Sequence, residues 1–150
     1  MPPVKQQVRT QVMSLLSGLA TSQTRLYPGK QAPWDEAAGQ MPGVAFYLES
    51  ELVTPVDKEG RYQHDLSLVV EMAAHGEESM VDGLLLTMEA EVEQALATDR
   101  LLGGLLSQPL SLVRVNPPAS DTRNGNATAV RQAEYRLRYV TLTGMPASVA

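Results

Sequence analysis

The chain has 150 residues, of which 43% are hydrophobic and 19% are charged, with a formal net charge of −5 and no cysteine. These values predict one folded domain over residues 1–150 and exclude disulfides, thiolate catalysis and thiolate metal sites. The acidic balance disfavours a protein that grips the phosphates of nucleic acids, because such binding needs clustered lysine and arginine. No stretch approaches 18 apolar residues, so we expect a soluble protein with no membrane partner.

The first half of the chain is predicted to contain one helix and two strands. Apolar residues spaced by three and four positions predict an amphipathic helix over residues 4–19. The proline- and glycine-rich residues 25–43 follow as an irregular connection. Alternating side chains then predict strands over residues 44–51 and 62–74, joined by a hairpin loop at 52–61.

The second half repeats this order with a longer helix. Periodic apolar residues predict a helix over residues 79–97, and the leucine-rich turn after it leads into a strand at 110–115. Residues 116–128 are rich in Asn, Gly and Pro and are predicted to form a long, mobile hairpin loop. A last alternating strand covers residues 129–143, and residues 144–150 are expected to be a flexible tail.

This element order, α-β-β-α-β-β, predicts an α+β fold. We expect an antiparallel or mixed four-stranded sheet packed with two main amphipathic helices on one or both of its faces.

The sequence offers few residues for catalysis. His64 and His75 are predicted on opposite faces of one strand, without metal-ligand spacing. Glu89 and Glu93 lie one helical turn apart, which fits a solvated helix face or, as an alternative, an acid–base pair. No nucleophile elbow or phosphate-binding loop is present. We therefore predict no enzyme activity, no cofactor and no metal site.

Two groups of residues are candidates for a subunit interface. Glu134, Arg136 and Arg138 alternate along the last strand, where they form either a solvated surface or ion pairs with a neighbour. Tyr27 and Trp34 lie in the irregular connection, where an exposed aromatic residue would suit an interface. The alternative for Trp34 is that it folds back as a lid on the core.

Several segments of the chain resemble the tail terminator proteins of long-tailed bacteriophages and prophages, the minor tail protein U-like family. The resemblance covers about residues 4–143. It rests on the amphipathic first helix and on the segments "TRLYPGK", "MPGVAFYLESE", "ALATDRLLGGLLSQPLSLV" and "AVRQAEYRLRYVT". The chain departs from the family in "QAPWDEAAGQ", which lacks a second Tyr-Pro element, and in the length of the loop at 116–128.

The resemblance implies a structural virion protein of the tail, assembled in the host cytoplasm. Such proteins cap the finished tail tube as a ring of six-fold symmetry, end tube polymerisation and present a surface to the head–tail connector, or neck, protein. DNA passes through the lumen of the ring without specific binding. The two hairpin loops would order on docking, so Arg123 and Asn124 join Tyr27, Trp34, Glu134, Arg136 and Arg138 as predicted interface residues.

Three alternatives stay open on the sequence alone. The first is a head–tail connector or tail-completion protein of the same particle. The second is a small enzyme that uses Glu89 and Glu93, and the third is a binding module unrelated to phages that dimerises through its sheet.

Overall fold

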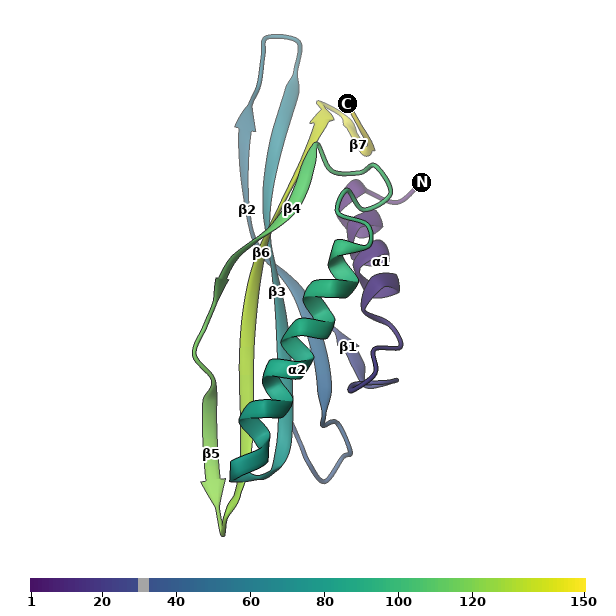
Figure 1. The fold of residues 1–150 in the computed structure, drawn as a ribbon. Helices are drawn as coiled ribbons and strands as arrows, with labels where there is room; N and C mark the ends of the chain where they lie inside the picture. The colour runs from purple at the N-terminus through teal and green to yellow at the C-terminus, as the bar shows by residue number, and fades with distance from the viewer. Residues whose placement is uncertain (30–32) are drawn as a thin grey trace.

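The computed structural model describes residues 1–29 and 33–150 as one long, twisted sheet with two helices against it (Figure 1). Residues 30–32, part of the predicted irregular connection, lie outside the described residues. The elements in chain order are α1 (Val4–Leu16), β1 (Leu26–Pro28), β2 (Gly43–Pro55), β3 (Arg61–Glu77), α2 (Glu78–Ala97), β4 (Gln108–Val115), β5 (Ala119–Arg123), β6 (Asn126–Leu142) and β7 (Met145–Val149).

The sheet is built around the pair β3 and β6. Every residue of β3, from Arg61 opposite Leu142 to Glu77 opposite Asn126, has an antiparallel partner on β6. The strand order is β1-β2-β3-β6-β4, and β5 and β7 also pair with β6. Only the contact of β1 with β2 is parallel, so the sheet is mixed.

The predicted four-stranded sheet with the order α-β-β-α-β-β is wrong. The sheet has seven strands, and the additional ones, β1, β5 and β7, lie in segments that the sequence predicts to be irregular. Each of these strands is short, so its sequence shows little of the alternation that marks a strand. Each is held in place by pairing with a longer strand. Tertiary pairing of this kind overrides local strand preference.

The predicted mobile loop at 116–128 is a tight hairpin for most of its length. β5 pairs with the start of β6 and turns through Asn124 and Gly125, whose φ angles are +52° and +80°. Two successive positive φ angles define the two-residue turn that Asn-Gly favours, because asparagine and glycine tolerate the left-handed region.

Residues 144–150 belong to the sheet and are not a tail. After a turn at Gly144, β7 runs back along the end of β6, with Leu142 opposite Met145 and Thr141 opposite Val149. Gln7 of α1 also donates a hydrogen bond of 2.8 Å to the carbonyl of Ala147.

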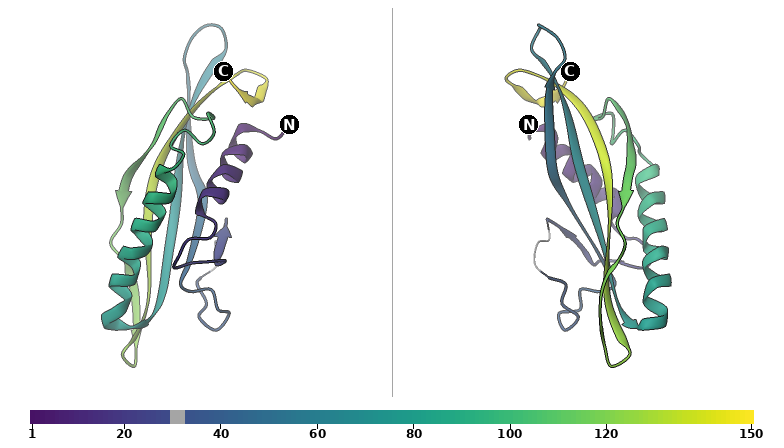
Figure 2. Two further views of the ribbon diagram at one scale, coloured as in Figure 1. Left: turned by 45° about the vertical axis from the view of Figure 1, so that its right-hand side comes forward. Right: turned by 90° about the vertical axis from the view of Figure 1, so that its left-hand side faces the viewer.

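Both helices lie on the same face of the sheet, and the opposite face is left uncovered by helix (Figure 2). The core forms between the helices and this face. Its buried members from α1 and α2 are Val4, Val8, Val12, Leu16, Val81, Leu85, Met88, Val92 and Leu96, and those from β2, β3 and β6 include Val44, Phe46, Leu66, Leu68, Val70, Met72, Ala133, Tyr135, Leu137 and Tyr139.

The leucine- and glycine-rich turn after α2 fastens the end of that helix to the sheet. Leu102 is fully buried although its φ angle is +49°, and Gly103 and Gly104 follow with φ angles of +68° and +86°. The carboxylate of Asp99 accepts a hydrogen bond of 2.8 Å from the amide of Gly103. Glycine adopts such angles at little cost, so the chain can reverse while the leucine stays in the core.

Among the described residues, neither α1 nor α2 combines the length and the apolar content needed to cross a membrane.

Replacing Leu85 by aspartate tests this packing. Leu85 is fully buried, whereas its neighbour Leu86 is 49% exposed. An unpaired buried charge costs several kcal/mol, so Leu85→Asp is expected to unfold the domain while Leu86→Asp stays folded. Circular dichroism and thermal melting of both variants measure this, and a Leu85→Asp protein that melts like the wild type would contradict the assignment of the buried stripe of α2.

Candidate interaction surfaces

The face of the sheet that points away from the helices, called the open face below, carries a network of polar side chains. At one end, Arg138 of β6 donates a hydrogen bond of 2.7 Å to Asp65 of β3. The same guanidinium reaches Gln108 of β4 at 3.3 Å. Arg138 is thus held by both neighbouring strands.

A second contact crosses the same three strands at Glu134. Ser67 of β3 donates to its carboxylate at 3.1 Å, and Arg114 of β4 donates at 2.9 Å. The hydrogen bonds from Arg114 and then from Ser67 lower the pKa of Glu134, and the nearby charge of Arg136 adds to this effect.

Arg136 itself lies between these two contacts and is exposed. Within residues 1–29 and 33–150, its guanidinium finds no hydrogen-bond or ion-pair partner. The open face therefore presents one arginine whose hydrogen-bonding groups are available to a partner.

Trp34 and Tyr27 meet at the other end of the open face. Their rings pack edge to face with centroids 5.7 Å apart, and the indole N–H of Trp34 donates to Glu71 at 2.7 Å. Gln132 donates to the same carboxylate at 3.1 Å. A Cβ added at Gly43 would lie 2.8 Å from the Trp34 ring, so glycine is needed beneath it.

Trp34 therefore folds back on the sheet, but on the open face and not on the helix-covered core. The burial of Tyr47 beside this group, followed by the charges of Glu71 and Glu49, raises the pKa of the Tyr47 hydroxyl.

The structure brings some of the predicted interface residues together and separates others. Glu134, Arg136 and Arg138 share the open face, as their alternation predicts. Arg123 and Asn124 lie at the tip of the β5–β6 hairpin, at the end of the molecule opposite the β2–β3 turn (Figure 1). Arg123 is exposed there, 3.5 Å from Asp121.

A cluster that sequence reasoning missed lies on the helix-covered face, where α1 meets β2. Glu51 of β2 contacts the ammonium of Lys5 and the Nδ1 atom of His64. The Nε2 atom of His64 lies 2.7 Å from the hydroxyl of Thr141, and its ring stacks on Tyr139 with centroids 4.4 Å apart. Thr141 is 6% exposed, so this hydroxyl is not presented to a substrate.

The electrostatics of this cluster favour a charged Glu51. Desolvation acts to raise its pKa, but the hydrogen bonds and charges of Lys5 and His64 outweigh desolvation, and the pKa is lowered. Burial and the nearby Glu51 carboxylate raise the pKa of Tyr139. The cluster thus fastens α1 to the base of the β2–β3 hairpin. A bulge in β2 between Leu48 and Glu51 turns Glu51 to the helix face, which strict alternation does not foresee.

The two carboxylates of the predicted acid–base alternative have different surroundings. Glu89 lies 3.2 Å from the guanidinium of Arg131 on β6, and both side chains are mostly buried. Glu93 is exposed near Tyr135. Burial, and then the charges of Glu93 and Glu89, raise the pKa of Tyr135 to about 12.

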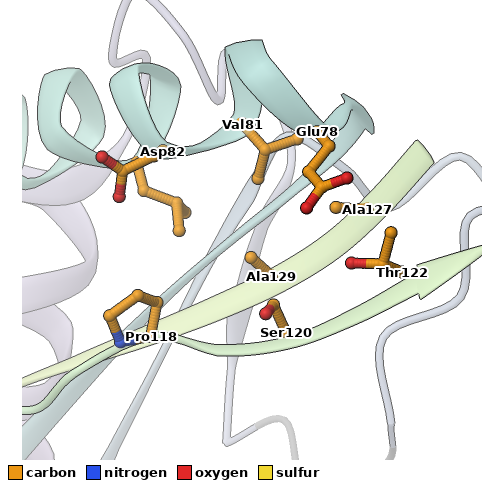
Figure 3. Close-up of a pocket in the computed structure, with 9 residues that line it drawn as sticks. Glu78, Val81, Asp82, Pro118, Ser120, Thr122, Ala127 and Ala129 are labelled. Atoms are coloured by element: carbon orange, nitrogen blue, oxygen red, sulfur yellow. The ribbon is translucent and has the colours of Figure 1, made fainter. Parts of the chain in front are cut away.

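A small cavity of about 120 Å³ separates the start of α2 from β5 (Figure 3). Glu78 and Asp82 line it from α2, and Ser120 and Thr122 line it from β5. Within the described part of the chain, no group of three His, Asp or Glu side chains is placed to hold a metal ion.

The β2–β3 hairpin projects beyond the helices (Figure 1). This segment, residues 52–61, is called the arm below. Leu52 is 66% exposed, Val53 47% and Val56 52%. Asp57 organises the turn by accepting a hydrogen bond of 2.9 Å from the amide of Glu59. The arm is therefore an ordered hairpin that carries apolar side chains into solvent.

Comparison with known proteins gives only distant similarities. No protein-family model and no curated protein sequence matches the chain. A solved structure of a protein known only by a sequence identifier is 16% identical, with a TM-score of 0.42, over 89% of this chain and 94% of that one. A chain in the virion of a native gene transfer agent particle is 15% identical, with a TM-score of 0.35, over 91% and 92%. The chain is thus a weak structural neighbour of a virion component.

The Glu51 cluster predicts an acid-dependent loss of stability. Because the pKa of Glu51 is lowered by folding, its contribution to stability is fully present above its ordinary value of 4.5 and is lost as the pH falls through the lowered value. Glu51→Gln is expected to cost about 1–3 kcal/mol at pH 7, and less in acid.

Urea unfolding across pH measures this difference, and Glu49→Gln, at an exposed position of the same strand, is the matched control. Equal stabilities of the two variants at pH 7 would show that the cluster contributes nothing.

Arg136 and Arg138 are expected to respond differently to charge reversal. Arg138→Glu places a carboxylate beside Asp65 and should lower the melting temperature, whereas Arg136→Glu, at an exposed position, should change stability by no more than about 0.5 kcal/mol. Thermal melting of the two single variants compares them. Equal melting temperatures would contradict the network described for the open face.

Proposed function

We propose that the chain is a structural subunit of a phage-type virion that caps the end of the tail tube as a closed ring, built from six copies. The ring ends polymerisation of the tube and provides the surface on which the head is joined. The observation that carries the proposal is the ordered arm, which holds Leu52, Val53 and Val56 in solvent on a chain that also resembles tail terminator proteins.

Apolar residues on an ordered projection favour association. Each of these three side chains is about half exposed or more, and none of them belongs to the core. Covering them with a partner would remove apolar surface from water at roughly 25 cal/mol per Å². Leu52 and Val53 face opposite sides of the strand, so the arm presents an apolar side chain to a partner on each of its faces.

A ring needs a head-to-tail contact, in which one surface of a copy meets a different surface of the next copy until the circle closes. The arm supplies one of these two contact surfaces, near one edge of the sheet. The open face adds ion pairs that hold Glu134 and Arg138 in place, together with the available guanidinium of Arg136. Side chains ordered before binding reduce the entropic cost of association.

The charge of the chain is compatible with a conduit for DNA. A net charge of −5 gives the subunit no general attraction for phosphates, so DNA would pass the ring without being held.

Growth of tail tubes in the presence of the purified chain tests the proposal. Electron microscopy of polymerising cognate tube subunits is expected to show tubes that stop growing and end in a ring when the chain is added, and tubes of uncontrolled length without it. Replacing Leu52 and Val53 together by serine should abolish capping, because the apolar surface of the arm is lost.

The matched control is Leu86→Ser, which changes a leucine of similar exposure on α2 and should leave capping intact. Tubes that grow equally with and without the chain would contradict the proposal. If the chain instead joins preformed tails to heads without changing tube length, it is a neck connector.

A further inference from the structure

We infer that neighbouring copies of the chain join through the edges of their sheets. In this contact, the outer edge of β2 in one copy lies along the outer edge of β4 in the next, and Val53 enters a groove between α2 and β4. The inference rests on the proposed function in one respect only, that the chain assembles with itself.

Both edges are open over a short length. β1 covers β2 only from Val44 to Phe46, which leaves the outer edge of residues 48–55 uncovered. β4 pairs with β6 on its inner side, and the carbonyl of Arg100 covers its start by accepting from the amide of Leu110. Among the described residues, no backbone hydrogen bond joins either residues 48–55 or residues 111–115 to a further strand. Unpaired edges of this kind are templates for pairing with another chain.

The directions of the two edges fit a repeating contact. β2, β3, β6 and β4 are antiparallel at each step, so β2 and β4 run in opposite directions within one copy. When a second copy is placed beside the first in the same orientation, its β2 meets the β4 of the first as an antiparallel pair. Because the two edges differ, the contact is head-to-tail, and each added copy leaves one edge free until a ring closes.

A groove beside β4, lined in part by apolar side chains, lies at this contact. It has a volume of about 280 Å³ and lies on the helix-covered side of the sheet. Leu110, Leu112 and Tyr135 line it from the sheet and Ala97 lines it from α2. The polar residues Glu93, Arg100 and Ser111 complete the lining. Leu112 is 42% exposed, so one wall of the groove is a leucine side chain that is partly in contact with solvent.

Val53 is placed to fill this groove in a neighbour. It pairs with His64, whose ring stacks on the core residue Tyr139, so Val53 points to the helix-covered side of the sheet. The groove opens on that same side of the next copy. A valine that is 47% exposed thus meets the apolar part of a groove, formed by Leu110, Leu112 and Ala97, across the paired edges.

The contact requires a stagger between copies. Leu48 of β2, Tyr135 of β6 and Leu112 of β4 lie at one level of the sheet, because each is linked to the next through paired residues. Val53 lies five positions further along the arm, so it reaches the groove only when the next copy is displaced along the strand. A closed sheet needs such a displacement between its strands.

The absence of cysteine from the chain allows a clean cross-linking test. Val53→Cys and Leu112→Cys are made as separate proteins, mixed in the presence of cognate tube ends, and treated with a short bis-maleimide that tolerates a small error of register. We expect a cross-linked dimer from the mixture and none from either protein alone. The chain with both substitutions should give a ladder that ends at the closed ring.

The control mixture replaces Val53→Cys by Leu86→Cys, whose exposure of 49% is nearly the same. Equal cross-linking in the control, or dimers from Val53→Cys alone, would overturn the edge contact. Tubes that are capped without any Val53–Leu112 cross-link would overturn the edge contact and leave the proposed function standing. Specific cross-linking with no effect on tube growth would support the contact and contradict the capping function.

Discussion

The antiparallel pairing of β3 with β6 is the constraint on which the rest of the structure depends. The two strands match residue for residue over the whole of β3, and this register decides which side chains face the helices. A slip of one residue would send Leu66 and Leu68 to the open face and bring Asp65 and Ser67 into the core. The buried stripes of α1 and α2 pack on the face that this register creates.

The same register arranges the surfaces that a partner would meet. It places Glu134, Arg136 and Arg138 on the open face, where strands on either side hold two of the three in hydrogen bonds. It also extends β3 beyond the helices, so that the end of β2 is carried out as the arm. The features that we associate with assembly therefore arise from the sheet itself, and the helices serve mainly to cover one of its faces.

Much of this arrangement can be predicted from the sequence. The prediction of the remaining parts fails for identifiable physical reasons. The two helices and the alternation of β3 and β6 follow from strong apolar periodicities. β1 and β7 are short strands whose pairing depends on distant partners, so their local sequence carries little signal. β5 could have been found, because Asn124-Gly125 is a recognised hairpin signal. The Glu51 cluster depends on a bulge that no periodicity reveals. The interface roles of the seven predicted residues stay predictions.

Hydrogen exchange of the backbone amides, compared between the free chain and the chain bound to tube ends, tests the central claim most directly. The account holds that the chain acts by association through its sheet edges. It predicts that the amides on the outer edges of residues 48–55 and 111–115 exchange rapidly in the free chain and become protected on assembly, while those in the middle of β3 and β6 are protected in both states. Assembly that leaves the exchange of both edges unchanged would contradict the account.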